Sequence, residues 1–135
     1  MRIAFGTDER APLTDAITAD LTEHGHEVVV VGNGEPWPDV GREVGEAVVS
    51  GRADRGVVCC WTGTGVSMAA NKVGGVRAAL CTDAETARGA RRWNDANVLA
   101  LGLRLTSPEL AREMLDAFLT TDADPGERAE IAKLG

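Results

Sequence analysis

Cations are scarce in this sequence, and they form no run. The 135 residues include 14 lysines and arginines against 21 aspartates and glutamates, which gives a formal net charge of −7. Nucleic acids and anionic membranes are bound through clusters of lysine and arginine. We therefore expect neither as a partner, although two or three placed cations would suffice for a phosphorylated metabolite.

Cysteine and long apolar runs are scarce as well. The three cysteines, Cys59, Cys60 and Cys81, are odd in number and two are adjacent, unlike a disulfide framework or a spaced zinc site. We therefore expect that the protein binds no metal, that its thiols are reduced and that it is cytoplasmic. The apolar stretch in residues 1–6 is too short for a signal peptide or a membrane span, and it predicts a first strand instead.

What the sequence does contain is an alternation of short apolar runs with longer segments of helical period. This pattern is typical of a parallel sheet covered by helices on both faces. With 44% apolar residues, the chain can bury the core of a single domain over residues 1–135. We predict an α/β fold, a three-layer α/β/α sandwich with a five-stranded parallel sheet in a Rossmann-like arrangement. The predicted strands are residues 2–5, 27–31, 56–60, 76–81 and 97–101, and the predicted helices are residues 12–23, 40–50, 67–72, 84–91, 107–119 and 125–134.

In such sheets ligands bind beyond the carboxyl ends of the strands. Residues 6–9, 33–38 and 60–65 follow predicted strands, and residues 92–95 directly precede the last one. We predict that these four segments carry the chemistry.

The most informative of them is the run Cys60-Trp61-Thr62-Gly63-Thr64-Gly65, which leads from a strand into a helix of small residues. Backbone N–H groups converge there near a thiol at a helix N-terminus, an arrangement that stabilises an oxyanion and favours a thiolate. The thiolate would act as proton acceptor or nucleophile. Anion binding, or a tight turn alone, is the competing interpretation. The endings typical of a P-loop or a dinucleotide-binding fingerprint are absent, so no nucleotide cofactor is expected.

Three segments together resemble the family of ribose-5-phosphate isomerase B and galactose-6-phosphate isomerase. They are Gly6-Thr7-Asp8, the run from Cys60 through Ser67 to Ala69-Ala70-Asn71-Lys72, and Asn94-Asp95-Ala96-Asn97-Val98-Leu99-Ala100-Leu101-Gly102. The resemblance extends over nearly the whole chain. It implies a five-stranded parallel sandwich and a cofactor-free aldose–ketose isomerase. It also implies a homodimer, or a tetramer, whose active sites are each built from two subunits.

The resemblance also implies roles for individual residues. Cys60 becomes the base that moves a proton between C1 and C2 of the sugar through a cis-enediolate, and Asp8 and Thr62 join it as catalytic residues. The amides near the glycine loop would hold the enediolate oxygen. The residues implied to bind substrate are Glu9, Trp61, Gly63, Thr64, Gly65, Ser67, Trp93, Asn94, Arg104 and Arg128, the two arginines as grips for a phosphate and Arg128 from the partner subunit.

The departures from the family pattern concern cations. Glu9 and Trp93 stand where the family commonly has histidines, and Asp124 stands where it commonly has a second arginine. The two histidines of this chain, His24 and His26, flank a turn before the second predicted strand, at the wrong end of the sheet for catalysis. We expect them to be surface residues. Glu9 is either a ligand for a substrate hydroxyl or a solvated acid.

All three tryptophans, Trp37, Trp61 and Trp93, fall at or beside the implied pocket. Their rings would narrow the pocket and stack on a sugar, whereas the competing interpretation makes each of them a core residue. Cys59 alternates with Cys60 along its strand, so we expect it to pack on the opposite face. Cys81 is expected to have a packing role.

The sequence therefore predicts an isomerase of a small sugar or sugar phosphate, most readily a pentose or tetrose phosphate. Two alternatives remain open. One is a non-catalytic module that binds a sugar phosphate, and the other is an isomerase of an unphosphorylated or secondary-metabolite sugar. Loss of both pocket histidines motivates the first alternative, and retention of the run from Cys60 to Lys72 speaks against it.

Overall fold

The computed structural model describes all 135 residues, and a parallel sheet of five strands forms its centre. The strands lie in the order β2-β1-β3-β5-β4, and every neighbouring pair is parallel. The predicted fold class is confirmed. The strands are β1 (Arg2–Thr7), β2 (Glu27–Asn33), β3 (Arg55–Cys60), β4 (Ala78–Leu80) and β5 (Val98–Gly102).

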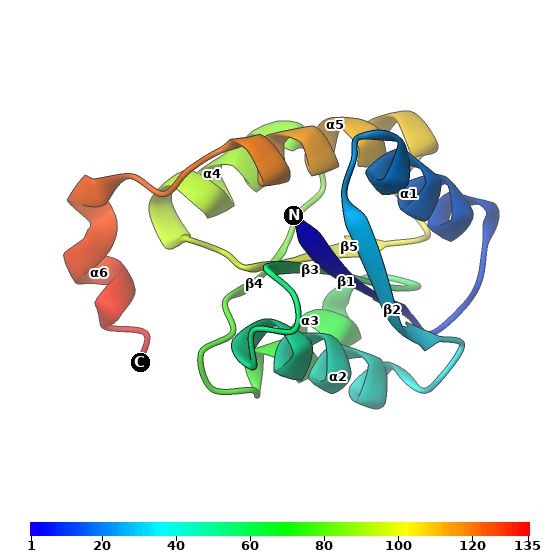
Figure 1. Ribbon diagram of the computed structural model, residues 1–135, viewed down its shortest axis with the longest axis horizontal. Coiled ribbons are helices and arrows are strands. Elements are labelled where there is room, and N and C mark those ends of the chain that lie inside the picture. Colours follow the sequence, from blue (N-terminus) through cyan, green and yellow to red (C-terminus); the bar gives the residue numbers. More distant parts are fainter.

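Helices cover both faces of this sheet (Figure 1). One layer holds α1 (Pro12–Glu23), α4 (Ala84–Asn94) and α5 (Pro108–Thr120), and the other holds α2 (Trp37–Val49) and α3 (Thr64–Asn71). After α5 a short 3₁₀ turn (Pro125–Glu127) leads into α6 (Arg128–Ala132), which projects from the body of the molecule (Figure 1). No helix combines the length and the apolar character needed to cross a membrane.

Two cores lie on the two sides of the sheet, because successive side chains of a strand point to opposite faces. Cys59 belongs to the core beneath α1, α4 and α5, where Phe118 is the largest fully buried side chain. Cys60 belongs to the core beneath α2 and α3, beside Val40 and Val66. The prediction that Cys59 and Cys60 face opposite ways is therefore confirmed.

Several predicted boundaries were wrong, and the reasons are local. Helix α2 begins at Trp37 instead of residue 40, because Pro36 serves as its N-cap and Pro38 suits a first turn. The strand predicted over 76–81 shrinks to Ala78–Leu80, because the amide of Val76 bonds to the carbonyl of Val73 in a turn. The helix predicted over 125–134 divides into the 3₁₀ turn and the short α6.

Helix α4 runs three residues beyond its predicted end at residue 91, up to Asn94. It stops at Asp95, which adopts a left-handed conformation with φ 49° and ψ 44°. Residues 92–94 are consequently the last turn of a helix and not part of a loop. Strand β5 follows only at Val98.

The register of the strands determines which residues share an edge of the sheet. Thr7 of β1 lies opposite Cys59, and Cys60 lies opposite Gly102 of β5. Since the strands are parallel, the residues that follow β1, β3 and β5 emerge at the same carboxyl edge. Residues that precede β5 lie at the amino edge.

Candidate active site

The Cys60 thiol is the centre of the carboxyl edge. It ends β3, is only 5% exposed, and accepts a hydrogen bond to Sγ from the amide of Gly63 at 3.2 Å. Gly63 has φ +81°, which favours glycine, and a Cβ there would lie 2.6 Å from Leu80 and 2.8 Å from the backbone of Leu101. The loop is thus folded tightly over the sulfur.

Helix α3 begins directly after this turn, at Thr64. The first amides of an α-helix lack intrahelical acceptors, and the helix dipole adds partial positive charge. Ser67 donates its amide to the carbonyl of Gly63 at 3.2 Å, and the hydroxyls of Thr62 and Thr64 are 2.8 Å apart. The structure thus brings Cys60, Thr62, Gly63, Thr64, Gly65 and Ser67 together, as an amide-rich cradle beside a thiol. Such a cradle stabilises a developing oxyanion.

Asp8 stands beside this cradle, at the end of the adjacent strand β1. Its amide donates to the carbonyl of Cys59 at 3.2 Å, and its side-chain oxygen Oδ1 is buried without a hydrogen-bond partner. Burial, followed by the charge of Glu9, raises the pKa of the Asp8 carboxyl above its ordinary value. A buried acceptor without a partner is costly, so this oxygen is suited to a ligand that donates a hydrogen bond.

Thr7 holds the loop that carries Asp8 and Glu9. Its hydroxyl donates to the carbonyl of Glu9 at 2.6 Å and accepts the Glu9 amide at 3.3 Å. The Glu9 side chain is exposed. The Glu9 carboxylate thus lies in solvent, close enough to Asp8 for its charge to raise the pKa of that carboxyl.

Arg104 joins the edge from β5. Its amide donates to the carbonyl of Trp61 at 2.9 Å, and both side chains line a cavity of about 220 Å³ together with Thr62. Thr82 and Thr106, which the sequence analysis did not single out, also line this cavity. Both follow a strand at its carboxyl end, so the rule applied to the other segments could have found them.

Two of the three tryptophans lie at this edge. The ring of Trp37 packs against Gly65 so closely that a Cβ on the glycine would lie 2.9 Å from ring atoms. Trp61 is 57% exposed at the mouth of the cavity that Arg104 lines. Neither ring is a core residue, in contrast to the competing interpretation.

Comparison with known proteins identifies this arrangement. Residues 3–134 match the family described as Ribose/Galactose Isomerase. The chain belongs to this family. Membership confirms the resemblance found in the sequence, and with it the expectation of an isomerase.

The alignments with individual relatives cover almost the whole of this chain. The D-erythrulose-4-phosphate isomerase of Pectobacterium atrosepticum is 38% identical over 142 residues, covering 100% of this chain and 93% of that protein. Ribose-5-phosphate isomerase B of Escherichia coli is 38% identical over 134 residues, covering 96% and 90% of the two chains. The structure of ribose-5-phosphate isomerase B from Clostridium thermocellum superposes with a TM-score of 0.94 at 41% identity, over 100% and 95% of the chains.

The remaining predicted site residues of this family member do not reach Cys60 within one chain. Trp93 and Asn94 end α4 at the amino edge of β5, and the five residues of that strand span about 16 Å. The expectation that residues 92–95 share an edge with the other three segments is wrong for a single chain, because they precede their strand instead of following it. Trp93 packs on Gly89 and is 53% exposed.

Arg128 is also remote from the thiol. It is the first residue of α6, on the C-terminal arm (residues 122–135) that leaves the body after α5 (Figure 1). The arm is tied to the body through the amide of Asp124, which donates to the carbonyl of Arg92 at 2.8 Å. Arg128, Trp93 and Asn94 therefore form a second group, apart from the carboxyl edge.

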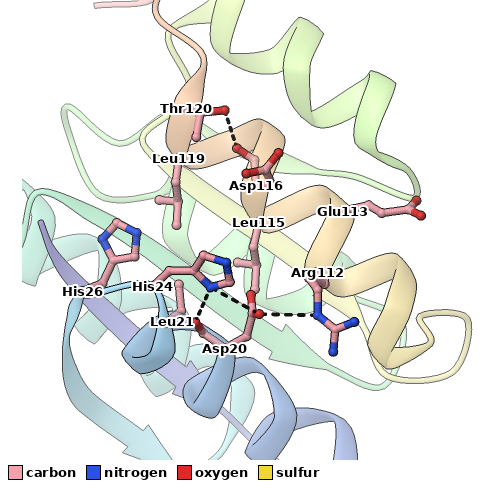
Figure 2. A pocket seen from close by; sticks show the side chains of 10 residues that line it. All are labelled: Asp20, Leu21, His24, His26, Arg112, Glu113, Leu115, Asp116, Leu119 and Thr120. Carbon is pink, nitrogen blue, oxygen red and sulfur yellow. Dashed lines mark hydrogen bonds and ion pairs between the residues drawn. The ribbon is translucent and has the colours of Figure 1, made fainter.

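The two histidines lie elsewhere, as predicted. His24 and His26 line a cavity of about 450 Å³ between α1 and α5, on the layer opposite α2 and α3. Figure 2 shows both side chains among the residues that line it. Nδ1 of His24 lies 3.4 Å from the Asp20 carboxylate, which also lies 3.5 Å from Nε of Arg112. The sheet separates this cavity from Cys60.

Proposed function

We propose that this protein interconverts the aldose and ketose forms of a small sugar phosphate, with the Cys60 thiolate as the base. The observation that carries the proposal is the Cys60 sulfur within the amide cradle of α3, next to a buried Asp8 oxygen that has no partner. A thiolate close to amide donors can take and return one proton without forming a covalent bond to the sugar.

The protons balance within the substrate. The thiolate of Cys60 removes the proton on C2 of the open-chain aldose, and the electron pair moves to the carbonyl oxygen on C1, which gives a cis-enediolate. Amides at the start of α3 stabilise the oxyanion, an effect usually large in such reactions. The thiol returns its proton to C1, while the hydroxyl proton moves from O2 to O1. Asp8 accepts a hydrogen bond from the hydroxyl at O1 or O2. The Thr62 hydroxyl, which belongs to the cradle, bonds the other of these two oxygens.

A second copy of the chain completes the site in this proposal. Large apolar side chains are exposed around α3, β4 and α4, with Trp61 at 57%, Met68 at 59%, Leu80 at 37% and Trp93 at 53%. β4 is also an edge strand, so a homodimer that covers this surface would remove both liabilities. Trp93, Asn94 and Arg128 would then enter the partner's active site.

The substrate we propose has four or five carbons and a phosphate. Arg104 at the cavity, joined by Arg128 from the partner, supplies the cations for it. A tetrose 4-phosphate cannot close a furanose ring, because its O4 carries the phosphate, so it needs no acid to open a ring. That chemistry suits a site with Glu9 and Trp93 in place of histidines. Similarity to an erythrulose-4-phosphate isomerase over the whole chain supports the same choice.

Deuterium incorporation tests the proposal directly. The protein is incubated in D₂O with tetrose, pentose and hexose phosphates and with the free sugars, and exchange at C1 and C2 is followed by NMR. We expect exchange with a tetrose or pentose phosphate. Replacement of the base in Cys60→Ala should lower the rate by about 10²–10⁴-fold. Cys59→Ala is the matched control, because that thiol faces the other core.

Two results would contradict the proposal. Unchanged exchange in Cys60→Ala would remove the base from its role. Binding of sugar phosphates, seen as a thermal shift, with no exchange at any pH would identify a non-catalytic binding module instead.

A further inference from the structure

Asp95 has an unusual backbone. It is the one non-glycine residue with a positive φ, 49°, and it terminates α4 directly after Asn94. Glycine usually occupies this position after a helix, since other residues pay for the left-handed conformation. Aspartate tolerates the left-handed conformation better than most residues. Its carboxylate also makes contacts that a glycine at this position could not make.

Each oxygen of this carboxylate meets a different arginine. Nη1 of Arg91 donates to Oδ1 at 2.8 Å, and Nη2 of Arg77 donates to Oδ2 at 3.2 Å. Nε of Arg77 also donates to the Asp95 carbonyl at 2.8 Å. The Arg91 side chain is only 6% exposed and that of Asp95 is 38% exposed, so the ion pair is shielded from solvent on its arginine side.

The two arginines extend the cluster to other segments. Arg91 donates to the carbonyl of Ala96 at 2.7 Å and to that of Thr121 at 3.0 Å, where the C-terminal arm begins. On the other side, the amide of Arg77 donates to Oδ1 of Asn97 at 2.7 Å, just before β5. One cluster thus fixes the end of α4, the entry into β5 and the exit of α5.

We propose that Asp95, held between Arg77 and Arg91, is a positioning residue for the active site of the partner subunit. The cluster adjoins the two segments whose predicted site residues lie away from the Cys60 of the same chain. These segments are Trp93–Asn94 and the C-terminal arm with Arg128. It lies at the amino edge, away from the chain's own Cys60. The inference rests on the proposed function and adds a residue that acts across the dimer without touching substrate.

Mixed dimers test the inference. Asp95→Asn keeps the size and tolerance for positive φ but loses the charge that two arginines share, and we expect kcat/KM to fall about 10- to 100-fold. If Asp95→Asn folds poorly, Asp95→Gly takes its place in the test, because glycine adopts a positive φ without strain. It should show the same fall in kcat/KM. Either variant is then refolded in equal amounts with Cys60→Ala. Activity should return to about a quarter of the wild-type value, because half of the dimers are mixed and each holds one intact site.

Two controls give each outcome a meaning. Asp54→Asn removes a carboxylate that pairs with Arg2 at the same end of the sheet, and it should leave kcat/KM unchanged. Asn94→Ala refolded with Cys60→Ala tests the shared site itself. If that mixture recovers activity while the Asp95 mixture does not, Asp95 acts within its own subunit and the positioning role is overturned alone. If neither recovers, the shared site fails as well. Unchanged kcat/KM in both Asp95 variants would also overturn the role.

Discussion

Gly63→Ala should be among the most damaging single-methyl additions in this protein. Gly63 has φ +81°, so an alanine there adopts a left-handed conformation. Its Cβ would lie 2.6 Å from Leu80 Cδ1, 2.8 Å from the carbonyl carbon of Leu101 and 3.0 Å from the Gly102 nitrogen. Leu80 is a flexible side chain at an edge, but Leu101 and Gly102 belong to the inner strand β5 and cannot move away.

The size of the effect has two parts. The left-handed conformation costs alanine about 1–2 kcal/mol. Overpacking against fixed backbone costs about 1–3 kcal/mol more, so unfolding becomes easier by about 2–5 kcal/mol in total. Gly25→Ala separates these parts, because Gly25 has nearly the same φ, +84°, with nothing within 4 Å of its Cβ position. Gly25→Ala should therefore be destabilised only by the cost of the left-handed conformation.

Urea unfolding at a fixed protein concentration measures both variants, and the concentration matters because mass action would stabilise the proposed dimer. Activity gives a second readout. A loop displaced by the methyl group moves the Gly63 amide away from Sγ of Cys60 and shifts the first amides of α3, which the proposed mechanism uses as oxyanion donors. Loss of one oxyanion donor lowers kcat by about 10²–10³-fold. Equal destabilisation of Gly63→Ala and Gly25→Ala, within about 0.5 kcal/mol, would refute the packing argument. Full activity of Gly63→Ala would refute the role of the amide.

Two further predictions concern pH. The pKa of Asp8 is raised in the folded state, so the group favours folding when protonated, and that contribution is lost as pH rises through the raised pKa from about 4 upward. Asp8→Asn should therefore flatten the stability profile above pH 4 while lowering kcat; a profile identical to wild type would contradict it. The pKa of His24 is raised by its bond to the Asp20 carbonyl and by the Asp20 charge. Its stabilisation is full below about pH 6.5 and is lost as pH rises through the raised value, so thermal unfolding of His24→Gln should lack that step.

The grouping of Cys60, Asp8 and Arg104 at one edge of the sheet depends on local rules. An apolar run ending at Cys60, the glycine that follows and the small residues of α3 each dictate their own conformation. Parallel pairing then brings Asp8 and Arg104 to the same edge, because these residues also follow strands. No contact far along the chain was needed for that grouping.

The errors occur where contacts between distant residues decide. The last turn of α4 is rich in charge, so the sequence pattern alone does not determine where the helix ends. Arg77 and Arg91 fix that end by bonding the carboxylate of Asp95. The strand predicted over 76–81 begins only at Ala78, whose amide and carbonyl both bond the side chain of Asn71. A pattern along the sequence contains neither fact.

The division of the predicted site into two groups also restricts how two copies can meet. A two-fold axis pairs one surface patch with itself, so this patch must include both the receiving group near Cys60 and the contributing group near Asn94. The groove along β4 and α4 meets this condition, because it is lined from Leu80 and Cys81 at one end to Trp93 and Asn94 at the other. Cys81 also lines the cavity beside Thr62. An axis across β4 would therefore bring the amino edge of each copy to the carboxyl edge of the other, twice. A head-to-tail contact that does not close into a ring would leave an unfilled site at the end of every row of subunits, so the proposed mechanism favours a closed assembly, of which the two-fold dimer is the simplest.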